Sequence, residues 1–378
     1  MNELIPTPAP RVRWKQVALF LGLTFLLTWL LDFAIWRTGG LAGNPAVGLA
    51  LQLQMLLPAF SAIVLGTFVF TDSPIYRSVK LGAPRIFYTF YMLFTIVYAG
   101  LAVWAFLSPI ETTLYLTGII ATALMLLGLL LVIILRAVGG RQAFSRAGLA
   151  GGKLYYWPLF SLALMALYGI QAALGYFFGQ GQVINPNAML VAMSAGNPSA
   201  LQLAQFQPAV VLAVLGVQMA VIGPIQGLLI AFGEEFGWRG YLQGELTRLG
   251  PIPGIALVGL IWGVWHAPVI AMGHNYPGYP VAGVFMMIGY CICLGFLLGY
   301  AMLKSGSVWL AALLHALNNQ FVSFLITFVY RPADTLFSFY VGVYSLIVPA
   351  VIIILLVLLD PVWRRRPAAE AKPAPELA

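Results

Sequence analysis

Runs of about twenty apolar residues follow one another along most of this chain. Such a run is long enough to cross the hydrocarbon core of a bilayer as a helix, whereas a membrane β-barrel would show short alternating segments. Of the 378 residues, 61% are hydrophobic and only 8% are charged, which is too little polarity for a soluble fold of this length. We therefore expect an all-α fold, a polytopic helical membrane protein.

The breaks in hydropathy divide the chain into about ten transmembrane helices. The first run is too long for the core of a signal peptide, so we expect it to remain as a helix. The predicted spans are 16–36, 48–70, 87–106, 112–135, 157–178, 208–232, 252–272, 281–303, 309–328 and 336–359.

The basic residues give this multi-pass arrangement an orientation. With the N-terminus inside, all but two of the 19 Lys and Arg residues fall in inside segments, the exceptions being Arg37 and Arg331. Both termini are therefore predicted to be cytoplasmic, in the plasma (inner) membrane of a bacterium, and the net charge of +8 reflects contact with the lipid bilayer. The basic residues are scattered over separate loops, so no nucleic-acid partner is expected.

Three charges, Glu234, Glu235 and Arg239, interrupt a segment that otherwise suits lipid and that continues the apolar run 210–230. A charge near the bilayer centre costs roughly 2.5–3.5 kcal/mol, so such residues usually face a bundle interior or a water-filled cavity. Glu235 and Arg239 are four residues apart and can pair on one helix face. Glu234 points about 100° away, so this carboxylate is left available for chemistry.

Two of the three histidines, His266 and His315, also lie inside apolar spans. Glu234 precedes the expected turn at Gly250 by 16 residues, and His266 follows that turn by 16. In an antiparallel hairpin both would lie about 24 Å from the turn. Asn319 is one turn beyond His315 on the same face, so the four polar side chains can converge inside the bundle.

These residue types indicate hydrolysis of an amide. A buried carboxylate and a histidine suit the activation of water, and a second histidine with a nearby Asn can donate hydrogen bonds to an oxyanion. The same Glu234, His266 and His315 could instead bind a divalent metal such as zinc that activates water. The hydrolytic interpretation does not require this metal, so the cofactor stays open.

The other polar candidates are predicted to have no part in chemistry. His274, in a short turn, is expected at the surface. Asp32 and Asp360 fall at the ends of predicted spans and are expected to be interfacial charges.

The order of these motifs resembles the CAAX-protease and bacteriocin-processing (CPBP) family of intramembrane endopeptidases, which includes the Ras-converting CAAX endopeptidases. The matching motifs are Glu234-Glu235-x-x-x-Arg239, then His266 with an aromatic residue four positions earlier, then His315-x-x-x-Asn319. They lie within about 212–328, and Trp262 stands where the family often has Phe.

The resemblance implies a role for each matching residue. Glu234 is expected to activate water with His266 as its partner, and His315 and Asn319 to bind the oxyanion. Glu235 and Arg239 are expected to form a structural ion pair that orients the site. The family has been described both as metalloproteases and as glutamate-dependent proteases, and the substrate is expected to be a membrane-associated peptide or protein, without a prenyl group.

The predicted organisation has five parts: a cytoplasmic segment (1–15), N-terminal transmembrane helices (16–207), the CPBP-like catalytic core (208–330), a last transmembrane helix (331–360) and a disordered cytoplasmic tail (361–378). Two other functions are compatible with the same residues. One is a proton-coupled transporter in which Glu234 and the histidines relay protons. The other is a non-catalytic immunity or scaffold membrane protein that keeps the motif as a structural network.

Overall fold

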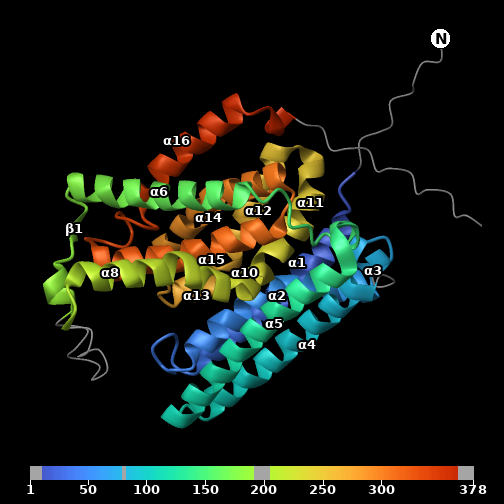
Figure 1. Cartoon of the computed structure of the whole chain (residues 1–378), viewed down its shortest axis with the longest axis horizontal. Helices are drawn as coiled ribbons and strands as arrows, with labels where there is room; N and C mark the ends of the chain where they lie inside the picture. The colour runs from blue at the N-terminus through green and yellow to red at the C-terminus, as the bar shows by residue number, and fades with distance from the viewer. Residues whose placement is uncertain (1–10, 79–81, 191–204, 365–378) are drawn as a thin grey trace, which may run out of the picture.

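The computed structural model describes residues 11–78, 82–190 and 205–364, and these form a bundle of helices (Figure 1). The predicted all-α class is confirmed. The first helices in the chain are α1 (Trp14–Arg37), α2 (Val47–Phe68), α3 (Pro74–Ser78), α4 (Gly82–Leu107), α5 (Glu111–Arg146) and α6 (Tyr156–Phe177). A short strand β1 (Gly181–Val183) pairs antiparallel with β2 (Tyr330–Pro332), with Gln182 opposite Arg331.

The second half of the chain supplies the rest of the bundle. Its first part is α8 (Pro208–Val217), η2 (Gln218–Ile222), α9 (Gly223–Gln226), α10 (Leu228–Glu235), η3 (Phe236–Leu242), α11 (Gln243–Leu246) and η4 (Thr247–Leu249). The remainder is α12 (Pro251–Trp265), α13 (Ala267–Ala271), α14 (Ala282–Ser305), α15 (Val308–Phe324), η5 (Leu325–Val329), α16 (Val343–Leu359) and η6 (Pro361–Arg364).

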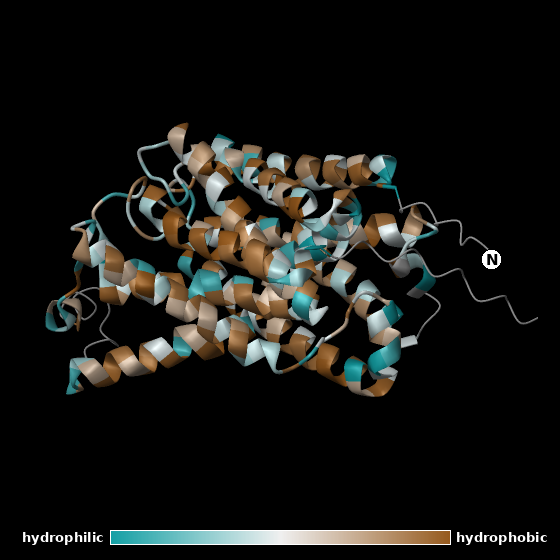
Figure 2. Cartoon of the chain, turned by 90° about the horizontal axis from the view of Figure 1, so that it is seen from above, coloured by the Kyte–Doolittle hydropathy of each residue, from teal (hydrophilic) through white to brown (hydrophobic). Residues whose placement is uncertain are grey.

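Within the described residues, eight helices are long and apolar enough to cross a membrane. Two shorter apolar helices, α12 and α16, occupy the predicted spans 252–272 and 336–359. The protein is therefore a multi-pass membrane protein, while the number of ten crossings depends on these two short helices. Figure 2 shows apolar residues along the lengths of the helices and hydrophilic residues mainly toward their ends.

The segment from Pro208 to Leu249 is helical but not one regular α-helix. Its turns widen to π-helix at η2 and again at η3, directly after the two glutamates. Such π-helical turns inside α-helices are frequent at functional sites. The turn expected at Gly250 is present: its φ of 113° suits glycine, and Pro251 begins α12.

Two glycines let α2 approach the segment that carries the acidic motif. A methyl group on Gly233 would overlap the backbone of Met55, and one on Gly237 would overlap Pro58. Small residues four apart are the usual means by which membrane helices pack closely, because the attraction between them is van der Waals contact. This contact brings the first half of the chain against Glu234.

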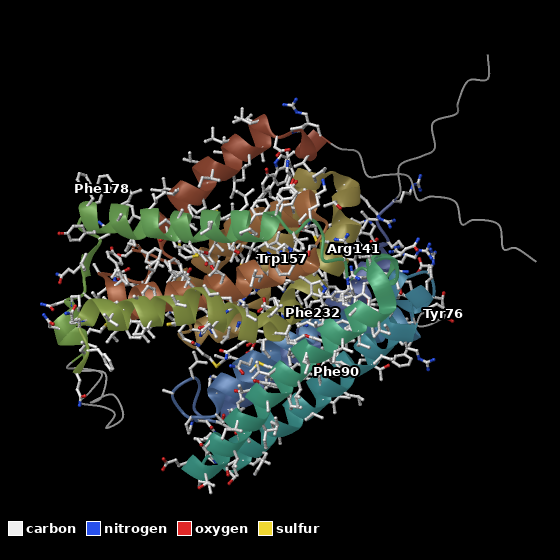
Figure 3. All side chains as sticks on the ribbon, in the orientation of Figure 1. Tyr76, Phe90, Arg141, Trp157, Phe178 and Phe232 are labelled. Atoms are coloured by element: carbon white, nitrogen blue, oxygen red, sulfur yellow. The ribbon has the colours of Figure 1, made fainter. Side chains whose placement is uncertain are left out.

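Aromatic packing fixes the same segment from the opposite side. Phe232, two residues before Glu234, is fully buried (Figure 3). Its ring stacks on Trp309 of α15 with centroids 4.3 Å apart and meets Phe87 of α4 edge-on at 5.5 Å. Such pairs contribute about 0.5–1.5 kcal/mol each beyond the area they bury.

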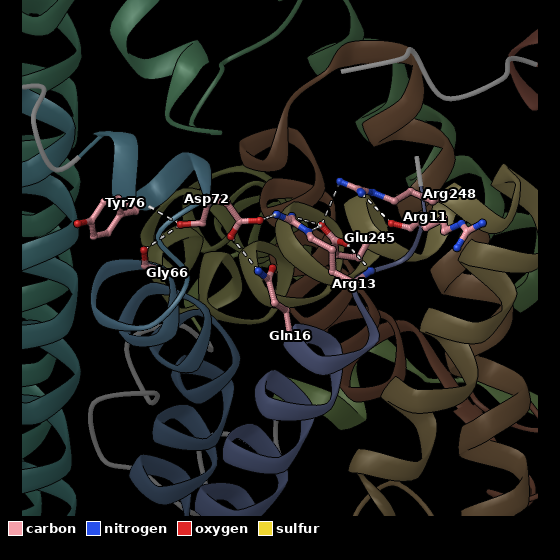
Figure 4. A network of polar contacts seen from close by, with 9 residues as sticks. Arg11, Arg13, Gln16, Gly66, Asp72, Tyr76, Glu245 and Arg248 are labelled. Atoms are coloured by element: carbon pink, nitrogen blue, oxygen red, sulfur yellow. Dashed lines mark hydrogen bonds and ion pairs between the residues drawn. The ribbon is translucent and has the colours of Figure 1, made fainter. Parts of the chain in front are cut away.

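A network of charged residues lies at the bundle end that carries α3 and α11 (Figure 1). There Arg13 bridges the carboxylates of Asp72 and Glu245, and Gln16 donates to Asp72 (Figure 4). The hydrogen bond to Glu245 raises the pKa of Arg13 above its ordinary value, although burial acts in the opposite direction. This network ties the start of α1 to α11 and to the turn after α2.

The tail predicted from residue 361 is wrong at its start. Pro361–Arg364 form the 3₁₀ turn η6, and Val362 and Trp363 are buried against α12 and α14. The Trp363 ring stacks on Tyr300 with centroids 5.8 Å apart, so apolar burial continues the fold past α16. The rest of the predicted tail, 365–378, lies outside the described residues, as does most of the predicted segment 1–15.

Candidate active site

A cavity of about 320 Å³ opens between α2, α10, α12, α14 and α15. All four residues predicted to be catalytic line it: Glu234, His266, His315 and Asn319. The cavity runs from Glu234, in the middle of the bundle, toward the loop residues His274, Asn275 and Tyr340. His274 and Asn275 lie in the loop between α13 and α14, and Tyr340 lies between β2 and α16. The first loop is at the end of α12–α13 remote from the Gly250 turn, so the cavity extends away from the Arg13–Glu245 network.

Glu234 is held by a neighbouring tryptophan. Its side chain is only 2% exposed, and Oε2 accepts a hydrogen bond of 2.6 Å from the indole Nε1 of Trp262 on α12. The guanidinium of Arg239 lies over the Trp262 ring, 4.1 Å from its centroid. The second carboxylate oxygen of Glu234, Oε1, has no hydrogen-bond partner among the described residues. This oxygen is the one left for water.

Glu235 joins two helices through one oxygen. Its Oε1 accepts from Nη1 of Arg239 at 2.8 Å and from Nδ1 of His315 at 2.8 Å. Arg239 and Glu235 are both fully buried, so this pair depends on its own contacts for compensation. The ion pair expected from the sequence is therefore present, and it also positions His315, which the sequence did not indicate.

Both histidines are held through Nδ1, but by different kinds of acceptor. His266 lies between α12 and α13, and its Nδ1 is 2.8 Å from the carbonyl oxygen of Trp262. A carbonyl only accepts, so Nδ1 carries the proton and Nε2 of the neutral ring has a free lone pair. The Glu235 carboxylate only accepts, so Nδ1 of His315 also carries a proton, and Nε2 is the nitrogen left for the cavity, a donor when the ring is doubly protonated.

A buried amide network orients Asn319. The Tyr168 hydroxyl of α6 and the Tyr290 hydroxyl of α14 both donate to Oδ1 of Asn318, the latter at 2.7 Å. Nδ2 of Asn318 then donates to Oδ1 of Asn319 at 2.8 Å. Since this bond occupies the oxygen of the Asn319 amide, its Nδ2 donor remains for the cavity.

Sequence reasoning missed Asn318 and both tyrosines. Asn318 directly precedes the motif residue Asn319, but adjacent residues of a helix point about 100° apart, so we did not expect it at the site. Tyr168 and Tyr290 are single aromatic residues in apolar spans, and nothing in their sequence neighbourhood marks them.

The structure corrects two other expectations. His274 is half-buried and lines the cavity, because the loop after α13 folds back over the end of that helix. Asp32 was expected to be interfacial, but it is 1% exposed and faces Gln54 of α2. The physical reason is that α2 packs on this face of α1, so Asp32 is covered by another helix and not by water or headgroups.

The residues proposed as metal ligands do not form a ligand set. Among the described residues no three His, Cys, Asp or Glu side chains are gathered around a common point. The arrangement therefore does not fit the His/His/Glu metal centre, and we derive no step through a metal.

Comparison with known proteins gives one match. A family model described as type II CAAX prenyl endopeptidase Rce1-like matches residues 207–321. No curated protein and no solved structure matches the chain. The matched range covers the helices from α8 to most of α15 and includes every residue of the predicted motifs.

Proposed function

We propose that the chain, whose residues 207–321 match the family model of type II CAAX prenyl endopeptidases, hydrolyses a peptide bond within the bilayer with Glu234 and His266 activating the water. The observation that carries the proposal is that Glu234, His266, His315 and Asn319 line one cavity, each with one polar atom that has no partner among the described residues. The substrate is a membrane-associated peptide or protein.

Glu234 and His266 activate the water through the atoms that carry no other bond among the described residues, Oε1 and Nε2. A water held by Oε1 of Glu234 can transfer a proton to this carboxylate or to Nε2 of His266 as its oxygen attacks the carbonyl carbon. The Trp262 indole keeps the carboxylate in one orientation, so its free oxygen faces the cavity. The proton is then available for the departing amine.

The second pair stabilises the charge that forms on the carbonyl oxygen. Nε2–H of His315, supported by Glu235, and Nδ2 of Asn319, oriented by Asn318, are both donors. They lie one helical turn apart on α15, the spacing at which two side chains can reach one atom. Donors fixed in advance need no reorganisation during the reaction, so this arrangement suits an oxyanion site.

The proposal includes an orientation. Arg13 and Arg248 belong to the network around Glu245, and the inside segments predicted from the sequence hold most of the basic residues, so we assign that end and both termini to the cytoplasmic side of the plasma membrane. The cavity then extends toward the outer side. In this proposal residues 208–330 form the catalytic core, the spans in 16–207 complete its walls, and the helix in 331–360 covers it.

The test is cleavage of a quenched membrane-peptide library by purified protein, with and without a chelator. Glu234→Gln should lower kcat by at least about 10²-fold, the usual scale for losing a general base. The matched control is Glu111→Gln, an exposed carboxylate outside the cavity, which should cleave like wild type. Equal cleavage by wild type and Glu234→Gln would reject the role of Glu234.

Other outcomes separate the alternatives. Cleavage that is lost with the chelator and returns with zinc would support the metal-dependent reading. Solute flux driven by a pH gradient in liposomes, without cleavage of any peptide, would support the transporter. An intact phenotype in Glu234→Gln cells would support the scaffold or immunity protein.

A further inference from the structure

The wall of the cavity opposite α15 comes from the first half of the chain, outside the range that matches the family model. It consists of Leu51, Gln52, Gln54 and Met55, all on α2. The two glutamines are neutral amides, and neither is used by the catalytic arrangement. Each of them is fixed by a partner on another helix.

Gln54 is oriented by a buried carboxylate. Its Nε2 faces Oδ2 of Asp32 at 3.4 Å, and Asp32 is only 1% exposed. A carboxylate accepts hydrogen bonds, so the amide nitrogen must be the atom that faces it. Oε1 of Gln54 is then left without a partner among the described residues, at the surface of the cavity.

Gln52 is oriented in the opposite sense. The hydroxyl of Tyr98 on α4 donates to its Oε1. The amide nitrogen Nε2 has no partner among the described residues and is available as a donor. The α2 wall therefore presents one acceptor and one donor, two positions apart along the same helix.

We propose that Gln52 and Gln54 form a subsite that binds the backbone of an extended peptide. Oε1 of Gln54 accepts from an amide N–H of the substrate, and Nε2 of Gln52 donates to a carbonyl. Asp32 and Tyr98 are positioning residues that act through the two amides. This assignment rests on the proposed function, because it gives the substrate of the same cavity its binding wall.

Two physical arguments favour a peptide backbone as the ligand. An extended peptide in a bilayer has unpaired N–H and C=O groups, each of which costs several kcal/mol unless it is bonded. Among the described residues that line the cavity there is no lysine or arginine, and the histidine held by a carboxylate, His315, is already paired with Glu235. A neutral donor and acceptor match an internal peptide segment.

The experiment measures binding separately from cleavage. The protein carries Glu234→Gln, and the probes are fluorescein-labelled, acetylated and amidated Ala/Leu pentapeptides with one backbone nitrogen methylated at a time. Fluorescence polarisation should show that methylation at one position weakens binding about tenfold, the scale of one hydrogen bond. Adding Gln54→Leu should weaken the parent peptide about tenfold and abolish the sensitivity to methylation.

The matched control is Gln171→Leu. Gln171 is also a buried glutamine, on α6, but it donates to the carbonyl of Ser345 and does not line this cavity. It should bind every peptide like the parent protein. Asp32→Leu should act like Gln54→Leu, because it releases the amide from its orientation.

Three results would overturn the subsite: unchanged binding in Gln54→Leu, weaker binding with the methylation pattern retained, or no binding of any pentapeptide. The catalytic proposal fails separately. Peptides that bind through Gln54 but are never cleaved by protein with intact Glu234 would leave the subsite and reject the protease. Wild-type cleavage by a Gln54→Leu variant with intact Glu234 would keep the protease and reject the subsite.

Discussion

The indole nitrogen of Trp262 donates to Oε2 of Glu234 at 2.6 Å, across the contact between α12 and α10. A phenylalanine, which the CPBP family often has at this position, could not make this bond. The same ring carries the Arg239 guanidinium at 4.1 Å, so Trp262 connects the proposed base to the buried ion pair. The aromatic residue of the motif is therefore a polar partner in this chain as well as a packing residue.

Trp262→Phe tests this connection. We expect kcat/KM to fall about tenfold, because Glu234 loses one charge-assisted hydrogen bond, and the protein to remain folded because the ring is kept. Cleavage kinetics and thermal unfolding in detergent measure the two effects. Trp309→Phe, in the aromatic cluster away from the carboxylates, is the control and should keep its kcat/KM.

The amide network predicts a second effect on the chemical step. Asn318→Asp keeps an acceptor for Tyr168 and Tyr290 but turns the donor toward Asn319 into an acceptor. We expect the Asn319 amide to flip, so that kcat falls by about 10²-fold with little change in KM, as for the loss of one oxyanion donor. Tyr290→Phe should have a smaller effect of the same kind. A rise in KM with unchanged kcat would contradict the oxyanion role.

The buried pair predicts that stability and activity can be separated. Glu235→Ala leaves Arg239 buried and unpaired, so the free energy of unfolding should drop by about 3–5 kcal/mol and the yield should fall. Replacing both Glu235 and Arg239 by Met should recover much of the stability, because no charge is then left uncompensated. Activity should stay low, since His315 has lost its carboxylate. Recovery of activity in the double variant would contradict this reading.

The contact between α10–η3 and α2 predicts a steric effect. Gly237→Val places a branched side chain against Pro58, so the helices must separate and the free energy of unfolding should fall by about 1–3 kcal/mol or more. Thermal unfolding and expression level measure this loss. Gly244→Val is the control, because a methyl group there meets nothing within 4 Å. Equal stability of the two variants would show that α2 is not packed as described.

The junction after α16 predicts a dependence on pH. Hydrogen bonds from Lys304, Tyr300 and the backbone of Val362 lower the pKa of Asp360 to about 2. A carboxyl whose pKa is lower in the folded state stabilises it above the unfolded value of about 4, and this contribution is lost as the pH falls through 2.

Asp360→Asn should therefore lower the free energy of unfolding by about 1 kcal/mol at pH 7, a modest value because the pair is partly exposed. The difference from wild type should be the same at pH 5 and should vanish toward pH 2. Thermal unfolding at the three pH values measures it. A difference that disappears between pH 7 and pH 5 would point to another group.

Short-range sequence patterns predict much of this protein's structure. The apolar runs determine the helices, because unpaired backbone in lipid is costly and helices satisfy it locally. The spacing of Glu235 and Arg239 determined their pairing, and the ordered motifs led to the family. The equal distances of Glu234 and His266 from the Gly250 turn agree with both lining the same cavity.

Contacts between distant helices could be decided only by the tertiary structure. Asn318 receives its partners from α6 and α14, Gln54 meets Asp32 of α1, and His274 returns to the cavity through a loop. Each of these residues is one polar side chain in an apolar segment, a pattern that local sequence cannot tell from an interfacial or surface residue. Its environment is set by which helix packs beside it, and that depends on side-chain shape across the whole bundle.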